Sequence, residues 1–225
     1  MFVLLIACRS SAPTSKDDGT YQGRTIAPAC SHLGADWLER PDREAREQPE
    51  RVLDLLNVKR GATVADVGAG TGYFTVRLAR RVGPDGRVLA TDLQPEMLRR
   101  IDARLGAEKL TNVQLIRATA HTAELPERCC DLILLVDVYH ELADPPGVMA
   151  GIRRALRDAG RLVLVEYRGE DPNVPIKPEH KMTLAQLKRE LEPLGFAFVE
   201  SLEALPDQRI VIFTRDDVIP AGPPR

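Results

Sequence analysis

Apolar and polar residues alternate in two rhythms between about residues 58 and 215. Short apolar runs are typical of buried strands, whereas apolar residues three and four positions apart mark one side of a helix. The runs predict strands at Thr63–Val67, Arg87–Thr91, Asn112–Ile116, Asp131–Val136, Arg161–Tyr167, Phe196–Leu202 and Arg209–Thr214. The helical spacing predicts helices at Tyr73–Val82, Pro95–Leu105, Pro145 to about Ala159 and Thr183–Leu194.

Strands that alternate with helices predict an α/β fold with a doubly wound, mostly parallel sheet, here of seven strands. The last two predicted strands are separated by a short segment containing Pro206 and Asp207, so we expect them to form a hairpin. We assign residues 58–215 to this domain. The following tail, residues 216–225, is rich in proline and is predicted to be disordered.

Residues 21–57 precede the domain and predict an N-terminal helical extension, because Trp37 and several later apolar residues are spread among many charges. Asp36 or Asp42 is a candidate helix cap. Two roles are open for this segment. It packs on the sheet as a structural helix, or Trp37, Arg40 and Arg43 fold over the binding site as a cover.

Residues 1–20 form a separate signal or tether segment. Phe2–Ala7 is an unbroken apolar run before Cys8, and a polar stretch follows. This resembles a bacterial lipoprotein signal, which implies a lipid anchor at Cys8 and a place in a bacterial envelope membrane. Otherwise the segment is an apolar N-terminus on a cytoplasmic protein. Six apolar residues are too few to cross a bilayer as a helix.

Composition narrows the classes of function. The chain has 225 residues, of which 44% are hydrophobic, and a formal net charge of −2. It therefore has enough apolar residues for a core but no basic excess for a general nucleic-acid binder. The four cysteines, at positions 8, 30, 129 and 130, show neither a disulfide framework nor a zinc-binding spacing. No metal site is predicted.

The main candidate site is the glycine-rich turn after the first predicted strand. Gly68, Gly70 and Gly72 interrupt the chain just before the helix that begins at Tyr73, and Thr71 is a candidate N-cap. A turn of this kind presents backbone N–H groups to a ligand and lets the ligand approach closely. Asp92 follows at the end of the next strand, and its two oxygens can accept hydrogen bonds from both hydroxyls of a ribose. The predicted ligand is nucleoside-like.

These motifs resemble those of the class I S-adenosylmethionine-dependent methyltransferases, over about residues 45–215. The resemblance implies a Rossmann-like methyltransferase fold, S-adenosyl-L-methionine as cofactor and a small-molecule methyl acceptor. It looks most like the branches related to quinone and arsenic methylation. The cofactor-binding residues that it implies are Asp66, Gly68, Ala69, Gly70, Gly72, Asp92, Leu93, Thr119 and Asp137. Thr119 stands where many members carry an acidic residue for adenine, and Asp137 would hold the amino group of the donor.

The acceptor is expected beyond the fourth predicted strand, because ligands of such sheets bind outside the carboxyl ends of the strands. His140 and Tyr139 are the candidate catalytic residues. His140 is the candidate base, since an imidazole titrates near neutrality, and Tyr139 is expected to line the pocket. Alternatively, His140 only packs the turn. Glu166 either lines the pocket or pairs with a nearby cation. The long segment Arg168–Met182, with its cationic side chains, is a candidate lid.

Two further functions remain alternatives. A nicotinamide-dependent oxidoreductase shares the glycine turn and the distal acid, but a dinucleotide site needs a third glycine where this chain has Tyr73. A non-catalytic module tethered to a membrane, which binds a ligand or a partner, would explain the signal-like start. The sequence does not indicate an oligomeric state.

Overall fold

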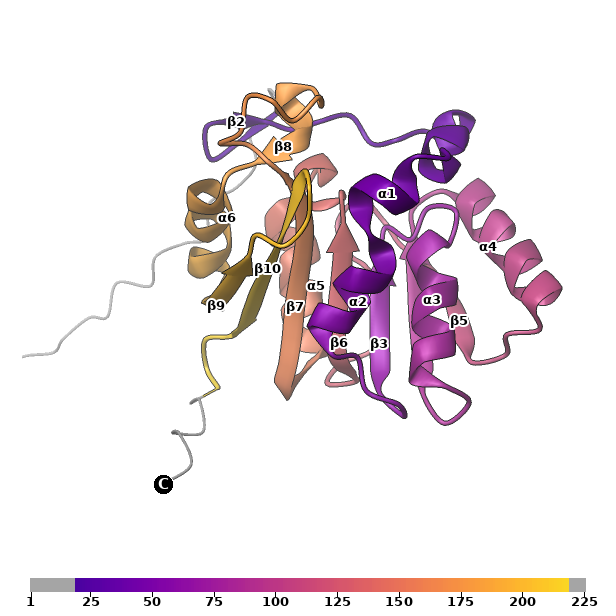
Figure 1. Cartoon of the computed structure of the whole chain (residues 1–225). Coiled ribbons are helices and arrows are strands. Elements are labelled where there is room, and N and C mark those ends of the chain that lie inside the picture. Colours follow the sequence, from indigo (N-terminus) through magenta and orange to yellow (C-terminus); the bar gives the residue numbers. More distant parts are fainter. Residues whose placement is uncertain (1–18, 219–225) are drawn as a thin grey trace, which may run out of the picture.

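The computed structural model describes residues 19–218 and contains one large, mixed sheet (Figure 1). The strands lie in the spatial order β5-β4-β3-β6-β7-β10-β9, and β8 pairs with the end of β7. In chain order they are β3 (Thr63–Val67), β4 (Arg87–Asp92), β5 (Val113–Arg117), β6 (Cys130–Val136), β7 (Leu156–Arg168), β8 (Lys181–Met182), β9 (Phe196–Leu202) and β10 (Gln208–Arg215). This sheet has eight strands, one more than predicted, and within it only β10 pairs antiparallel with its neighbours. The doubly wound, mostly parallel sheet and its closing hairpin are therefore confirmed.

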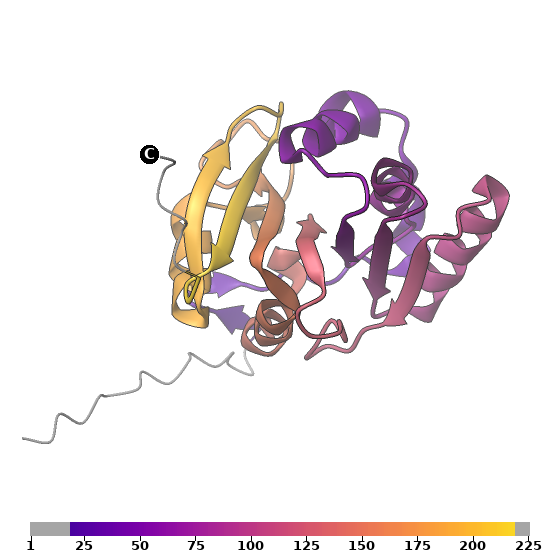
Figure 2. The ribbon, with the colours of Figure 1, turned by 90° about the horizontal axis from the view of Figure 1, so that it is seen from below.

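Helices cover both faces of the sheet (Figure 2). α2 (Pro49–Leu56) and α3 (Tyr73–Val82) pack on one face, and α4 (Pro95–Glu108) packs beside α3. α5 (Pro145–Ala155) and α6 (Leu184–Leu191) cover the other face. β6 explains this arrangement, because Leu132 and Leu134 belong to one core while Ile133 and Leu135 belong to the other. A central strand that is buried on both sides must be apolar at every position.

The order of the strands positions the functional site. From β3 the chain builds β4 and β5 on one side and then crosses to place β6 and β7 on the other. The carboxyl ends of β3 and β6 are thus the point at which the winding reverses. Ligands of doubly wound sheets bind in the crevice at such a point.

The N-terminal segment is less helical than predicted. It begins with a short hairpin of β1 (Thr20–Tyr21) and β2 (Arg24–Thr25), followed by the 3-10 helix η1 (His32–Glu39) and α1 (Arg43–Glu47). Two-residue strands have too little alternation to be recognised in a sequence. The signal-like residues around Cys8 and the tail residues 219–225 lie outside the described residues.

Several predicted boundaries and caps were wrong. α5 ends at Ala155, because the next residue, Leu156, is extended and pairs with Cys130 of β6. Gly72, not Thr71, occupies the N-cap position of α3, and the Thr71 hydroxyl instead donates a hydrogen bond to Glu39 over 2.5 Å. Local sequence could not show this contact, since η1 is brought to α3 by the tertiary fold.

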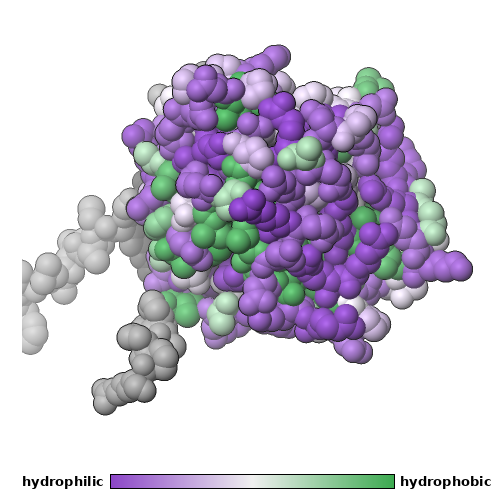
Figure 3. Space-filling view, viewed as in Figure 1, coloured by the Kyte–Doolittle hydropathy of each residue, from purple (hydrophilic) through white to green (hydrophobic). Residues whose placement is uncertain are grey.

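The surface seen in Figure 3 is largely hydrophilic, with apolar side chains gathered over the part of the sheet near β10. Val199 of the edge strand β9 is 52% exposed there. Among residues 19–218, no helix has both the length and the apolar composition that crossing a bilayer requires.

Two glycines should respond oppositely to substitution by alanine. Gly72 has φ +82°, and a Cβ on it would lie 3.2 Å from Ile101. We expect Gly72→Ala to destabilise the protein by about 1–3 kcal/mol. Gly106 lies within α4 with open space around it, so Gly106→Ala should stabilise by about 0.5–1 kcal/mol. Urea denaturation of both variants tests this; equal effects would contradict it.

Candidate active site

A cavity of about 510 Å³ opens at the carboxyl ends of β3, β4 and β6. The turns after these three strands form its floor. Residues of η1 and α1 border it from the N-terminal segment, and η3 (Pro178–His180) with the loop before it borders it from the other end. A concave, partly apolar site of this volume at the winding reversal is the usual form of a small-molecule pocket.

The predicted glycine turn lines the cavity through Gly68, Ala69 and Gly70, but Gly72 does not line it. Three of the N–H groups that were expected to face a ligand are used within the fold instead. The N–H groups of Gly68 and Ala69 both donate to the Thr91 carbonyl, and that of Gly70 donates to Asp92. The turn is therefore held to β4 by its own backbone, and Gly72 serves the packing of α3 on α4.

Asp92 stands at the end of β4 and is 6% exposed. One oxygen, Oδ2, accepts from the Gly70 N–H over 2.9 Å, and Oδ1 accepts from the Gln94 N–H over 2.8 Å. Burial raises the pKa of this carboxyl even though these hydrogen bonds oppose it. Each oxygen retains lone-pair capacity, so the fixed carboxylate can accept two further hydroxyl groups from the cavity. Leu93, which lines the cavity beside it, is 46% exposed and offers an apolar surface.

Asp137 follows β6 with a left-handed backbone, φ +54°. Its Oδ2 accepts a hydrogen bond from Gln208 over 2.8 Å, whereas its buried Oδ1 has no partner among the described residues. Burial, reinforced by the charges of Glu47 and Glu166, raises the pKa of Asp137 well above its usual value. A buried carboxylate oxygen without a partner is costly, and it lines the cavity, so it suits a cationic ligand group such as an amine.

Asp66 also lines the cavity and is 3% exposed. Its Oδ2 accepts a hydrogen bond from the Thr75 hydroxyl over 2.6 Å, which secures β3 to α3. Burial nevertheless raises the pKa of Asp66 to about 6, because the charged form loses its hydration.

This raised pKa predicts a pH dependence of stability. A folded-state pKa above the unfolded one gives stability that is complete below the unfolded pKa of about 4 and is lost as the pH rises through about 6. The difference in the free energy of unfolding, Asp66→Asn minus wild type, should therefore be about 2 kcal/mol more favourable to the variant at pH 8 than at pH 4.5. Urea denaturation at both pH values measures the change. A difference that does not vary with pH would show that Asp66 is ionised throughout.

His140 lines the cavity from the 3-10 helix η2 (Tyr139–Glu141) and is 2% exposed. Its Nδ1 lies 2.6 Å from Glu166 Oε2, and its Nε2 lies 3.2 Å from Nδ1 of His180. Burial works against the charged imidazolium, but the charges of Glu166, Asp137 and Glu141 outweigh it and raise the pKa of His140. Burial and the neighbouring His140 lower the pKa of His180. The two imidazoles therefore have different proton affinities.

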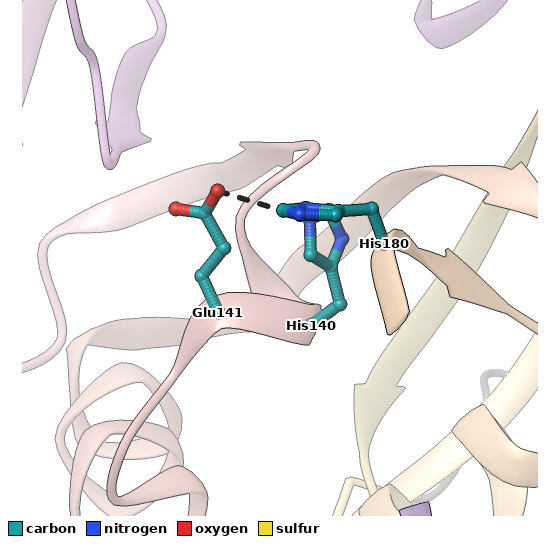
Figure 4. Close-up of side chains that lie close together, drawn as sticks. All are labelled: His140, Glu141 and His180. Atoms are coloured by element: carbon teal, nitrogen blue, oxygen red, sulfur yellow. Dashed lines mark hydrogen bonds and ion pairs between the residues drawn. The ribbon is translucent and has the colours of Figure 1, made fainter. Parts of the chain in front are cut away.

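Figure 4 shows the rings of His140 and His180 side by side, with the carboxylate of Glu141 directed toward them. Glu166 lies behind His140 and does not line the cavity, so it pairs with the histidine rather than with a lysine or arginine. Of the cationic residues in the predicted lid, Lys177 and His180 line the cavity. The lid segment is partly ordered by η3 and β8 rather than being a plain loop.

Besides Gly72, two predicted site residues lie outside the cavity. Tyr139 points away from the cavity, is fully buried, and donates its hydroxyl hydrogen bond to Glu190 over 2.9 Å. Thr119 is exposed, and its hydroxyl accepts from the N–H groups of His121 and Thr122 in a local turn. Adenine recognition by Thr119 is therefore not supported. His121 is 77% exposed, as a solvent-facing loop residue should be.

The cover predicted from the N-terminal segment reaches the cavity, because Trp37, Arg40 and Arg43 all line it. The Arg40 guanidinium lies 4.1 Å from the centre of the Trp37 ring, and the Arg43 guanidinium lies 4.0 Å from that of Tyr73. Both arginines also contact the buried Glu47, with Arg43 2.6 Å away. Glu47 lines the cavity too. From the sequence it was not identified as a site residue, since its pattern is that of any charged residue on a surface helix.

Comparisons with known proteins identify the family of this chain. A family model described as a methyltransferase domain matches residues 58–203. A ubiquinone/menaquinone biosynthesis C-methyltransferase, UbiE, of Pasteurella multocida is 31% identical over 121 residues, which are 51% of this chain and 43% of that protein. The matched part thus spans less than half the length of that relative.

Among solved structures, a SAM dependent methyltransferase from Aquifex aeolicus superimposes with a TM-score of 0.78 at 25% identity, over 85% of this chain and all of that chain. The [4+2]-cyclase SpnF, at 15% identity and a TM-score of 0.63 over 75% and 80% of the two chains, shares the fold alone. The family model covers well over half of the chain, and the strand order and the site at the carboxyl edge agree with it. The chain belongs to the class I S-adenosylmethionine-dependent methyltransferase family.

Proposed function

We propose that this protein transfers a methyl group from S-adenosylmethionine to a small molecule. The observation that carries the proposal is the pairing of two carboxylates in one cavity. Asp92 is fixed to accept two hydroxyl groups, and Asp137 presents an unpartnered oxygen suited to an amine. A ribose and an amino group are the polar ends of that donor, so the residues fit it.

Charge supports the same ligand. Asp66, Asp92, Asp137 and Glu141 all line the cavity, and burial raises the pKa of each. Buried carboxyl groups gain most from a neighbouring positive charge. The donor supplies an electrophilic methyl group on a positively charged sulfonium. The acids of the cavity would hold that charge next to the glycine turn.

The acceptor end of the cavity is the part that contains His140 and His180. An acceptor with a hydroxyl or thiol group must lose a proton before it can attack, and these imidazole nitrogens are placed to influence that proton. Glu166 fixes the proton of His140 on Nδ1, so Nε2 is the nitrogen available on the cavity side. The N-terminal segment borders the cavity, which favours a small acceptor over a macromolecule. We therefore propose a small molecule as the class of acceptor.

Isothermal titration of the full chain tests the proposal. S-adenosylmethionine and S-adenosylhomocysteine should each bind at one site per chain, and NADH should not bind, because Tyr73 fills the place of the third dinucleotide glycine and donates its hydroxyl hydrogen bond to Glu44. Binding of neither sulfur compound would refute the proposal. Mass-spectrometric detection of S-adenosylhomocysteine formed with a panel of phenols and thiols then separates an enzyme from a module that only binds the donor.

A further inference from the structure

Three metal-binding side chains meet at the acceptor end of the cavity. Nε2 of His140, Nδ1 of His180 and a carboxylate oxygen of Glu141 all lie within 4.8 Å of one another. We infer that these three residues bind a divalent transition-metal ion, with Zn²⁺ the best match to the ligand set. The inference rests on the proposed function only for the role of the ion, because the site itself follows from the geometry.

The distances suit tetrahedral coordination. Two nitrogens that are each 2.0–2.1 Å from a tetrahedral zinc ion are about 3.3 Å apart, and the two imidazole nitrogens here are 3.2 Å apart. Oε1 of Glu141 lies 3.9 Å from Nε2 of His140, so a small rotation of a flexible side chain completes the set. Two histidines and one glutamate, with a fourth position left open, are a known ligand set of catalytic zinc.

The side chains behind the cluster orient it as a metal site requires. Glu166 is fully buried and accepts the Nδ1–H of His140, so in the neutral ring Nε2 is the unprotonated nitrogen and faces the cluster. The other oxygen of Glu141, Oε2, accepts the backbone N–H of Cys30 over 3.2 Å. These contacts hold two of the three ligands in place without using their metal-binding atoms.

The competing explanation is that His180 simply donates a hydrogen bond to His140. Such a pair would need no third group, yet the Glu141 carboxylate also converges on it. Two carboxylates, Glu141 and Glu166, adjoin the two imidazoles. A divalent cation would compensate the negative charge of both carboxylates.

The ion has a defined chemical role at this place. An acceptor hydroxyl or thiol that binds at the open position would have its pKa lowered, because the cation stabilises the anion. Its O–H or S–H bond would break and the proton would pass to solvent. The lone pair of the resulting anion would form a bond to the methyl carbon of the donor as the carbon–sulfonium bond breaks, and S-adenosylhomocysteine would leave. His140 then serves as a metal ligand and not as a free base.

Titration with Co²⁺ tests the site without any need for an acceptor. The full chain is first stripped with a chelator. Co²⁺ should then bind one ion per chain and give the intense visible absorption of a tetrahedral site, and Zn²⁺ should displace it. His180→Ala and Glu141→Gln should each weaken Zn²⁺ binding at least tenfold. His121→Ala is the matched control, because that histidine is exposed and also pairs with a carboxylate, Asp144. The affinity of this variant for Zn²⁺ should equal that of wild type.

A parallel titration with S-adenosylmethionine keeps the outcomes separate. Donor binding by His180→Ala and His121→Ala confirms that both variants are folded, since neither residue belongs to the proposed donor site, and urea denaturation checks the fold of Glu141→Gln. Donor binding without a Co²⁺ spectrum, or with a spectrum that His180→Ala leaves unchanged, overturns the metal site and leaves the methyltransferase proposal standing. A Co²⁺ spectrum without donor binding overturns the proposed function alone.

Discussion

Asp92→Asn should weaken the binding of S-adenosylmethionine and S-adenosylhomocysteine by about 100-fold or more. The carboxylate accepts the N–H groups of Gly70 and Gln94, one on each oxygen. An asparagine must turn its NH₂ group toward one of these two donors, so one ribose hydroxyl loses its acceptor and the other loses a charged one. Charge-assisted hydrogen bonds contribute about 1.5–3 kcal/mol each, so losing two amounts to at least two powers of ten.

Stability should change much less than affinity in this variant. Burial raises the pKa of Asp92, so neutralising the side chain removes a charge that the folded state disfavours. Titration calorimetry measures the affinity, and urea denaturation checks the fold. Asp102→Asn, on the exposed side of α4, is the matched control and should bind as wild type does. An affinity of Asp92→Asn within threefold of wild type would show that Asp92 does not touch the ligand.

Arg24→Met should lower the free energy of unfolding by about 3 kcal/mol, the largest single effect on stability that we expect. The Arg24 guanidinium contacts both oxygens of Glu190, at 2.8 and 3.2 Å, and Glu190 is fully buried in α6. Without the arginine, a buried carboxylate keeps only the hydrogen bonds from Tyr139 and Gln186. An uncompensated buried charge of this kind is costly.

The same variant tests whether the N-terminal hairpin belongs to the folded unit. Arg24 also donates to the backbone carbonyl of His140 over 3.0 Å, so it joins β2 to both α6 and η2. The double variant Arg24→Met/Glu190→Gln should recover part of the loss, because it removes both charges. Arg189→Met, an exposed neighbour of Glu190, serves as control and should change stability by less than about 0.5 kcal/mol. Equal unfolding midpoints for Arg24→Met and Arg189→Met would mean that the hairpin is not docked.

Much of the fold was readable from the sequence because its signals are local. The apolar run of β6 predicts a buried strand, and the glycines before Tyr73 predict a tight turn, from residues that are adjacent in the chain. Asp92 could also be placed, since a strand, a helix and a strand bring it to the same edge of the sheet as the glycine turn. The prediction for Thr119 was wrong because a threonine can satisfy its hydroxyl within its own turn, and nothing in the sequence distinguishes that from a ligand contact.

The acceptor end shows where local signals stop. Tyr139 and His140 are adjacent, yet the short η2 helix sends one side chain toward α6 and the other into the cavity. The direction of each depends on what packs behind it: Glu190 receives the Tyr139 hydroxyl, and Glu166 receives the His140 ring. Both glutamates are far from Tyr139 and His140 in the sequence, so no local spacing predicts these pairs.

The sequence by itself determined the alternation of strands and helices, the glycine turn and the acid at the end of β4, because each depends on residues close together in the chain. Only the tertiary structure decided that His180, forty residues beyond His140, completes a cluster with it and Glu141, and that the N-terminal segment lines the cavity. Contacts between distant residues follow from how whole elements pack, and the periodicity of a single element does not contain that information.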